Sequence, residues 1–306
     1  MSRSTCANCG GTLRPWLPVV KDPQTGDFFT IVRCANCGLG KTRPSPDDLA
    51  YYYGPSYHGG RHGITALWCA HRRLHWVKSL AGAGTGRRLL DIGCGDGTFL
   101  LAAARAGWQV VGTEFNPESA RRSGLDVRSD LVEVDDGALY DCITSWHSLE
   151  HMRDPNKVVA ALRRLLAPRG SLIIAVPDAG GLQARVFSRY WLHLDVPRHL
   201  YHFNLSSIKT LLSSSGFTIV STRHQEFEYD LLGWSQSALN TLTPIPNIFF
   251  AVLSGRPATT SRPWLCLSLV LGVIFSCIAL PLVLLGSAIR RGGTLVVMAR
   301  PKLEDD

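Results

Sequence analysis

The stretch RRLLDIGCGDG, residues 87–97, decides the fold that this sequence predicts. Its apolar first half has the pattern of a buried strand that ends at Asp91, and glycine then stands at every second position. An alanine- and leucine-rich stretch follows at 98–106 and has the pattern of a helix that stops before Gly107. A strand, a glycine turn and a helix in this order let a polar ligand approach the backbone closely, and the amides at the helix N-terminus can bind an anionic group.

The next strand pattern, residues 109–114, ends in a second acid. Glu114 comes about 20 residues after the glycine turn, where a site for a ribose-containing cofactor needs an acceptor for the ribose hydroxyls. The spacing DxGxGxG resembles motif I of the class I S-adenosylmethionine-dependent methyltransferases. The resemblance implies that Gly93, Gly95 and Gly97 lie under the methionine part of S-adenosylmethionine and that Glu114 binds its ribose. Glycine turns after strands also serve packing alone, and this alternative stays open.

Two more acids belong to the cofactor site that the resemblance implies. Asp91 opens the motif itself. Asp130 follows a brief strand pattern at 125–127, at the position where the family has the acid that meets the adenine amino group. The alternative for Asp130 is a loop aspartate that is simply solvated.

Strand and helix patterns alternate along the rest of the central chain. Further strands are expected at 140–146, 171–177, 217–222 and 293–300, with helices that begin at 64, 154 and 206. We therefore expect an α/β fold with a Rossmann-like, doubly wound sheet of seven strands, the last of them antiparallel.

Histidines follow the strand 140–146 in the segment WHSLEH, residues 146–151. The carboxyl end of a strand in an open parallel sheet borders the crevice where ligands bind. The segment resembles that of methyltransferases acting on small molecules, and it differs from the Asn/Asp-Pro-Pro-Tyr segment of those that methylate base amines. His147 and His151 are therefore the first candidates for the general base, since a neutral imidazole suits an oxygen or activated-carbon acceptor. Glu150 is expected either to orient a histidine or to cap a helix.

A third candidate base, His199, lies in a loop crowded with polar and aromatic residues, 191–203. The part PRHLYHF resembles a stretch found in one zinc-ribbon-bearing group of these methyltransferases. His199 and His202 are equally compatible with hydrogen bonds that stabilise the loop.

Two near-identical knuckles near the N-terminus predict a metal site. CxxC pairs supply Cys6 and Cys9, then Cys34 and Cys37, and four thiolates suit tetrahedral zinc. With every ligand a cysteine, no coordination position is open for catalysis, so we expect a structural zinc in a ribbon. A redox role for the CxxC pairs is the alternative.

An uncharged apolar run, residues 265–289, is about 25 residues long and so is long enough to cross a bilayer. Trp264 precedes it, and Arg290 and Arg291 follow it, as interfacial anchors commonly do. Because the sixth and seventh strands are expected in one sheet, the chain must return to the side that it left. The alternatives are therefore a re-entrant pair broken at Pro281, a partner helix at 242–253, and an insertion that lies in the membrane interface.

These patterns together predict the domains and the function. The expected domains are a zinc ribbon at 1–43, a linker with a leading helix at 44–84, a methyltransferase domain at 85–225 and 293–306, and a membrane-associated insertion at 226–292. The net charge of +8 fits an anionic membrane surface or nucleic acid, and no signal peptide is expected from the polar start of the chain.

We expect a methyltransferase at the cytoplasmic face of the membrane that acts on an oxygen or carbon of a small or lipid-linked acceptor. The alternatives are an RNA methyltransferase with a zinc ribbon and a non-catalytic membrane scaffold.

Overall fold

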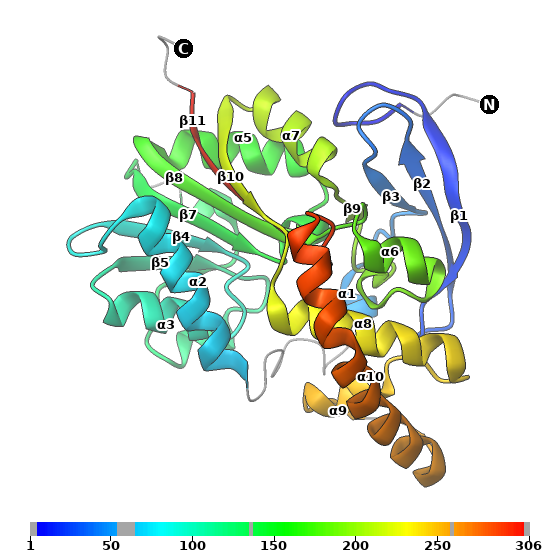
Figure 1. Ribbon diagram of the computed structural model, residues 1–306. Coiled ribbons are helices and arrows are strands. Elements are labelled where there is room, and N and C mark those ends of the chain that lie inside the picture. Colours follow the sequence, from blue (N-terminus) through cyan, green and yellow to red (C-terminus); the bar gives the residue numbers. More distant parts are fainter. Residues whose placement is uncertain (1–4, 54–64, 135–136, 258–259, 303–306) are drawn as a thin grey trace. The chain divides into compact units, whose positions relative to one another are not determined.

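The computed structural model describes residues 5–53, 65–134, 137–257 and 260–302 (Figure 1). Two compact units share the chain. One comprises 58–176, 211–222 and 296–306; the other comprises 1–57, 177–210 and 223–295. Parts of the predicted linker and of the C-terminal tail, 54–64 and 303–306, lie outside the described residues.

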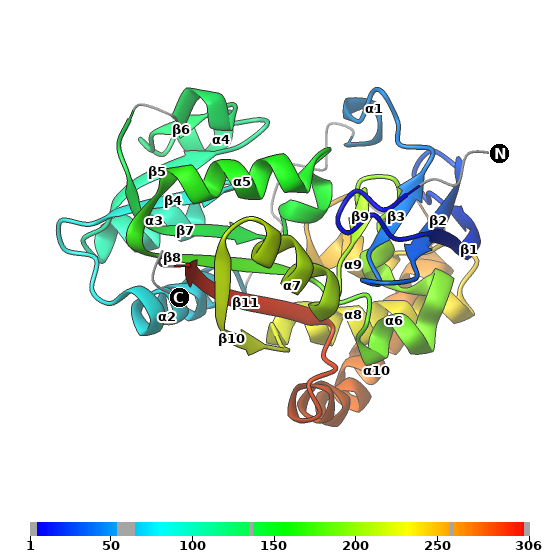
Figure 2. The same ribbon diagram turned by 90° about the horizontal axis from the view of Figure 1, so that it is seen from above.

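A seven-stranded sheet forms the first unit's frame, with the strand order β10-β11-β8-β7-β4-β5-β6. The central pairs β8–β7, β7–β4, β4–β5 and β5–β6 are parallel, and β11 runs the other way (Figure 2). The α/β fold and its mixed seven-stranded sheet are thus confirmed. The strands are β4 (Arg88–Ile92), β5 (Gln109–Thr113), β6 (Val127–Arg128), β7 (Tyr140–Trp146), β8 (Leu166–Pro177), β10 (Phe217–Arg223) and β11 (Thr294–Pro301).

Helices cover the two faces of this sheet. Apolar side chains of α2 (Ala66–Ala81) and α3 (Thr98–Arg105) pack with those of β4, β7 and β8 into one buried cluster. On α5 (Pro155–Leu165) the side chains of Val159, Leu162 and Leu165 are buried, and Asp154 accepts a hydrogen bond from the Lys157 amide at 3.1 Å, as an N-cap residue does. The remaining helices here are α4 (Glu118–Arg121) and the end of α7 (Leu205–Ser214).

The second unit contains the cysteine knuckles and a four-stranded sheet. Its order is β1 (Leu13–Lys21), β2 (Phe28–Cys34), β3 (Gly40–Arg43) and β9 (Tyr201–His202). The last strand comes from the PRHLYHF stretch, since Gly40 pairs with His202 and Lys41 with Tyr201. Residues 177–210 belong to the same compact unit as the cysteine knuckles, although they lie within the predicted domain 85–225. The unit also holds α1 (Ala50–Tyr53) and α6 (Leu182–Phe187).

The apolar insertion forms α8 (Phe227–Leu242), α9 (Ile248–Leu253) and α10 (Arg262–Ala288). Of the three alternatives for this segment, the re-entrant pair broken at Pro281 is wrong, because α10 continues through this residue. Its buried positions form a stripe of mostly small residues, whereas most of its apolar side chains are exposed. By length and composition α10 is able to cross a membrane, but a buried core helix passes the same test. The buried positions are Ser268, Gly272, Ala279, Val283 and Gly286.

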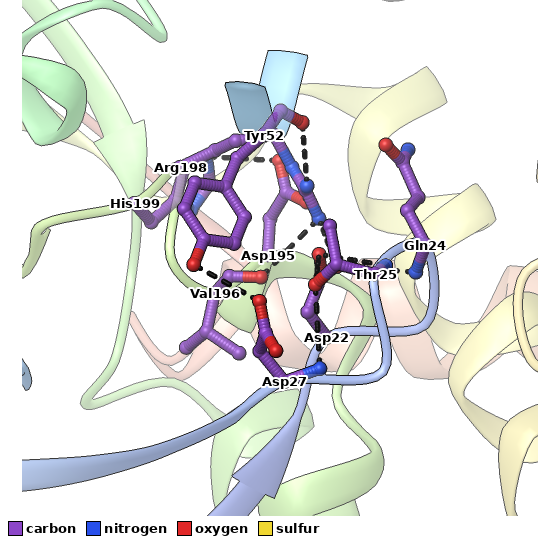
Figure 3. A network of polar contacts seen from close by, with 9 residues as sticks. All are labelled: Asp22, Gln24, Thr25, Asp27, Tyr52, Asp195, Val196, Arg198 and His199. Carbon is purple, nitrogen blue, oxygen red and sulfur yellow. Dashed lines mark hydrogen bonds and ion pairs between the residues drawn. The ribbon is translucent and has the colours of Figure 1, made fainter. Parts of the chain in front are cut away.

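A buried arginine joins the β1–β2 turn of the second unit to the loop before β9 (Figure 3). The Arg198 guanidinium is 1% exposed and donates to Asp22 Oδ1 at 2.8 Å, to Asp195 Oδ1 at 2.7 Å and to the Tyr52 carbonyl at 2.9 Å. Asp22 is fully buried and also accepts from the Thr25 hydroxyl at 2.9 Å. The β1–β2 turn is thereby held to the loop that precedes β9.

We expect Arg198→Met to lower this unit's free energy of unfolding by about 3–5 kcal/mol, because Asp22 is then left as a buried charge without its cation. Guanidinium unfolding measures the change. The matched control is Arg14→Met on the exposed side of β1, which should stay within about 0.5 kcal/mol of the native protein. Equal losses in both variants would contradict the role of the buried pair.

Candidate functional site

The glycine turn lies at the carboxyl end of β4, as the sequence predicts. Gly93, Gly95 and Gly97 have φ angles of +70°, +59° and +81°, a region that L-residues with side chains rarely adopt. A Cβ on Gly93 would overlap the Ser148 hydroxyl, so this turn and the segment after β7 approach each other closely. A Cβ on Gly95 would meet no atom within 4 Å, so the backbone there faces open space. That open backbone is what a cofactor lying across the turn requires.

Glu114 faces the turn from the end of β5. Its Oε2 accepts a hydrogen bond from the Gly95 amide at 2.8 Å, and its side chain is half-buried. This carboxylate is therefore fixed beside the open backbone at Gly95. The residues present fit the ribose-bearing cofactor that motif I implies, because an acceptor for hydroxyl groups stands next to an uncovered glycine turn.

Asp91 lies underneath the turn, 2% exposed. Its Oδ1 accepts a hydrogen bond of 2.6 Å from the Thr144 hydroxyl on β7. Burial raises the pKa of this carboxyl to about 7, although the Thr144 hydrogen bond and the charge of Arg73 act in the opposite direction. Asp91 thus links the ends of β4 and β7.

Asp130 is exposed at the end of β6, where its Oδ1 accepts from the Val132 amide at 3.0 Å. This bond begins a short 3-10 helix, Leu131–Val134. Asp130 thus follows β6 directly and its carboxylate is open to solvent, so the adenine contact stays a prediction.

His147 and His151 follow β7 in the same unit as the glycine turn. The His147 amide donates to the Ala175 carbonyl at 2.9 Å, and its φ is +50°. Its Nδ1 lies 3.8 Å from Glu150 Oε1, so the buried Glu150 carboxylate faces the imidazole. Of the two roles expected for Glu150, this geometry favours orienting a histidine. His151 is half-exposed at the end of the same turn.

His199 belongs to the other unit, with the ribbon. Its Nδ1 is 2.8 Å from the His193 carbonyl, and its Nε2 is 4.0 Å from Asp195 Oδ2. His202 Nε2 is 2.9 Å from the Thr42 hydroxyl, which donates to the His199 carbonyl at 2.7 Å. Burial lowers the pKa of His202 to about 3, so this ring stays neutral. Both histidines therefore make contacts that stabilise the loop, which was the alternative to a catalytic role. His199 stays a candidate base.

The four knuckle cysteines come together. Their Sγ atoms all lie within 4.8 Å of one another, with Cys6–Cys37 at 3.7 Å and Cys9–Cys34 at 3.4 Å. Each knuckle is closed by a backbone bond, from Gly10 to the Cys6 carbonyl and from Gly38 to the Cys34 carbonyl. Burial of the Cys34 thiol is outweighed by backbone amides of Cys37 and Asn36, which lower its pKa to about 7. Four sulfurs at this spacing are the donor set that zinc prefers.

Two contributors to the site were not predicted. Thr144 anchors Asp91, and Ser148 packs on Gly93. A polar residue at a buried position of an apolar strand is a signal for Thr144. For Ser148 the sequence offers no signal, because the contact depends on how two loops meet.

The chain is similar to known methyltransferases. A family model described as "Methyltransferase domain" matches residues 62–222, more than half of the chain. The ubiquinone biosynthesis O-methyltransferase of Bordetella pertussis is 30% identical over 174 residues, which cover 51% of this chain and 72% of that protein. The protein of the same name from Bordetella avium is 39% identical over 110 residues, 32% of this chain and 46% of that protein. This chain thus spans less than half of the latter's length. A crystal structure of a SAM-dependent methyltransferase from Archaeoglobus fulgidus gives a TM-score of 0.48 at 19% identity, covering 82% of this chain and 99% of that one.

We expect Glu114→Gln to weaken S-adenosylmethionine binding by roughly 10- to 100-fold, because an amide replaces a charged acceptor for the ribose hydroxyls. The amide oxygen retains an acceptor for the Gly95 N–H, so the turn itself should persist. Isothermal titration with the cofactor measures the change. Glu118→Gln, on the exposed side of α4, is the matched control and should bind as the native protein does. Equal affinity in all three proteins would remove Glu114 from the site.

Proposed function

The chain belongs to the class I S-adenosylmethionine-dependent methyltransferases, and on that premise we propose that it methylates an oxygen of an apolar, lipid-linked acceptor. The observation that carries the acceptor class is α10, an exposed apolar helix in the same chain as the cofactor residues. The printed names of the Bordetella relatives support an oxygen acceptor. The alternative is methylation of an activated carbon, which the structure of the labelled product would reveal.

When bound, S-adenosylmethionine supplies a methyl group on a sulfonium, which a nucleophile attacks in line. The turn at Gly93–Gly97 and Glu114 would hold the cofactor, and Asp130 would meet its adenine. His147 or His151 is proposed to take the acceptor's proton, with His199 as the third candidate. The Glu150 carboxylate, 3.8 Å from His147 Nδ1, favours the protonated imidazole that this transfer creates.

The ribbon is proposed to hold a structural zinc through Cys6, Cys9, Cys34 and Cys37. The sheet of this unit is small, and a metal that fixes both knuckles would contribute directly to its stability.

We also propose that α10 attaches the protein to the cytoplasmic face of the membrane without a net crossing. Because β10 and β11 neighbour each other in one sheet, the chain between them must return to the side that it left. A return crossing by α8 is unfavourable, since this helix buries the polar side chains of Asp230, Gln236 and Asn240. A monotopic insertion of α10 satisfies both constraints.

Methyl transfer is tested with methyl-labelled S-adenosylmethionine supplied to the purified protein with host lipid extract and host RNA in parallel. We expect label in the lipid phase. Gly93→Arg is the inactive control, because even a Cβ at this position would overlap the Ser148 hydroxyl. Label in RNA alone would reject the lipid acceptor in favour of an RNA acceptor, and bound cofactor without any labelled product would favour the scaffold.

Zinc binding is tested by metal analysis of the purified protein. We expect about one zinc ion per chain, and its loss in the double variant Cys6→Ser, Cys34→Ser, since two thiolates of the tetrahedral set are removed. The matched control is Cys266→Ser, Cys277→Ser on α10, where both cysteines are exposed. Unchanged metal content in the Cys6→Ser, Cys34→Ser variant would contradict the proposed zinc site and favour a redox role for the CxxC pairs.

Membrane attachment is tested by fractionating cells that express the full chain. We expect the native protein with the membranes and the variant Val270→Lys, Val273→Lys in the soluble fraction, because both side chains project from the exposed side of α10. Val186→Lys, Val220→Lys alters two valines of similar exposure elsewhere and should leave the distribution unchanged. Equal soluble fractions of the native protein and the α10 variant would contradict the proposed membrane attachment.

A further inference from the structure

A cavity of about 340 Å³ lies within the ribbon-containing unit. Its walls come from the end of β1, from the segment 189–196, and from the connection between α8 and α9. All of these residues belong to one compact unit, and none belongs to the glycine turn or the cysteine cluster. The volume is in the range of sites that hold small molecules.

The inner part of this cavity is apolar. Five of its lining residues are buried hydrophobic side chains: Val20, Trp191, Leu192, Leu194 and Val196. Pro244 and Pro246 add rigid apolar surface from the α8–α9 connection. Such a lining favours a hydrocarbon portion of a ligand.

Positive charge stands at the rim. Lys21 and Arg189 line the cavity and are exposed, and neither has an ion-pair partner among the residues that the structure describes. The carboxylate in the lining, Asp195, is paired with Arg198 at 2.7 Å. The charge that remains for a ligand is therefore cationic, which favours an anionic group at the rim.

The walls are held in place before any ligand binds. Arg198 ties Asp22, the neighbour of Lys21, to Asp195 (Figure 3). The Asn240 amide joins two further lining segments, donating to the Tyr190 carbonyl at 3.2 Å and to Asn247 Oδ1 at 2.9 Å. A site built in advance loses little conformational freedom on binding.

We propose that this cavity binds an anionic amphiphile, with a phosphate monoester at Lys21 and Arg189 and an apolar chain against Trp191 and Leu192. The two portions of the lining, cationic outside and apolar inside, match the two portions of such a molecule. None of the lining residues is among those proposed to hold the cofactor, and the binding of an amphiphile can be measured without methyl transfer.

The test is isothermal titration of the full-length protein in dodecyl maltoside with octyl phosphate, and with inorganic phosphate as the head group alone. Each buried methylene contributes about fourfold in affinity, so octyl phosphate should bind at least about tenfold more tightly than inorganic phosphate. Lys21→Gln, Arg189→Gln should weaken octyl phosphate binding by about tenfold. The matched control is Arg14→Gln, an exposed arginine on β1 outside the cavity, and it should bind as the native protein does.

A second variant and a vesicle arm separate the remaining outcomes. Val19→Trp narrows the cavity from an exposed position and should reduce binding of octyl phosphate while leaving thermal stability intact. Vesicle binding is compared with Val270→Lys, Val273→Lys present in both proteins, so that α10 no longer attaches them. If Lys21→Gln, Arg189→Gln then loses binding to phosphatidic acid vesicles, the natural source is a lipid head group; if vesicle binding is unchanged, it is a free amphiphile. Equal octyl phosphate affinity in native protein and double variant would overturn the proposal, as would equal affinities for octyl and inorganic phosphate. Methyl transfer to lipid can succeed or fail independently of these results.

Discussion

The close approach of the Gly93 backbone to Ser148 is the constraint on which the cofactor unit depends. It brings the turn after β4 against the segment after β7, although the two are far apart in sequence. Directly below, the Thr144 hydroxyl binds the buried Asp91 carboxyl and joins the same two strands. The segment that carries His147 and His151 can approach the turn this closely because residue 93 has no side chain. The glycine is thus required by packing as well as by ligand access, and the two explanations considered for the motif do not exclude each other.

The ribbon unit depends on a different interaction, the buried pair of Arg198 and Asp22. A buried ion pair is favourable only when further hydrogen bonds satisfy both groups, and here Tyr52, Asp195 and Thr25 supply them. The crowding of polar residues in PRHLYHF therefore has a structural cause. His202 accordingly pairs with Thr42 in the sheet, and a polar, aromatic loop is not by itself a catalytic signal.

Local sequence patterns predicted most of the strands and helices. The features that the sequence did not predict depend on contacts between residues far apart in the chain. The strand expected at 140–146 is β7, and Glu114, the acid that the resemblance assigns to the ribose, accepts a hydrogen bond from the Gly95 amide. The strand is recognisable from its run of apolar residues, and the position of Glu114 follows from its spacing after the glycine motif. The pairing of β9 with β3 has no such signal, because two paired residues of a short strand show no periodicity. The Arg198–Asp22 contact spans 176 positions in the sequence and likewise depends on the finished fold.

The small residues of α10 determine which side of this helix is buried and which side is exposed. Its buried stripe, from Ser268 through Gly272 to Gly286, contacts the unit through residues with little side chain, and a Cβ on Gly272 would press into the Phe249 ring. Close backbone approach on one side leaves the larger apolar residues on the others, where Val270, Val273 and Leu284 are all more than half exposed. Exposed apolar area on this scale is unfavourable in water at about 25 cal/mol per Å². A helix selected only to fill a soluble core would bury its large side chains and expose its small ones. The opposite distribution in α10 supports the proposed apolar environment around the helix, whereas α8 buries the polar side chains of Asp230, Gln236 and Asn240.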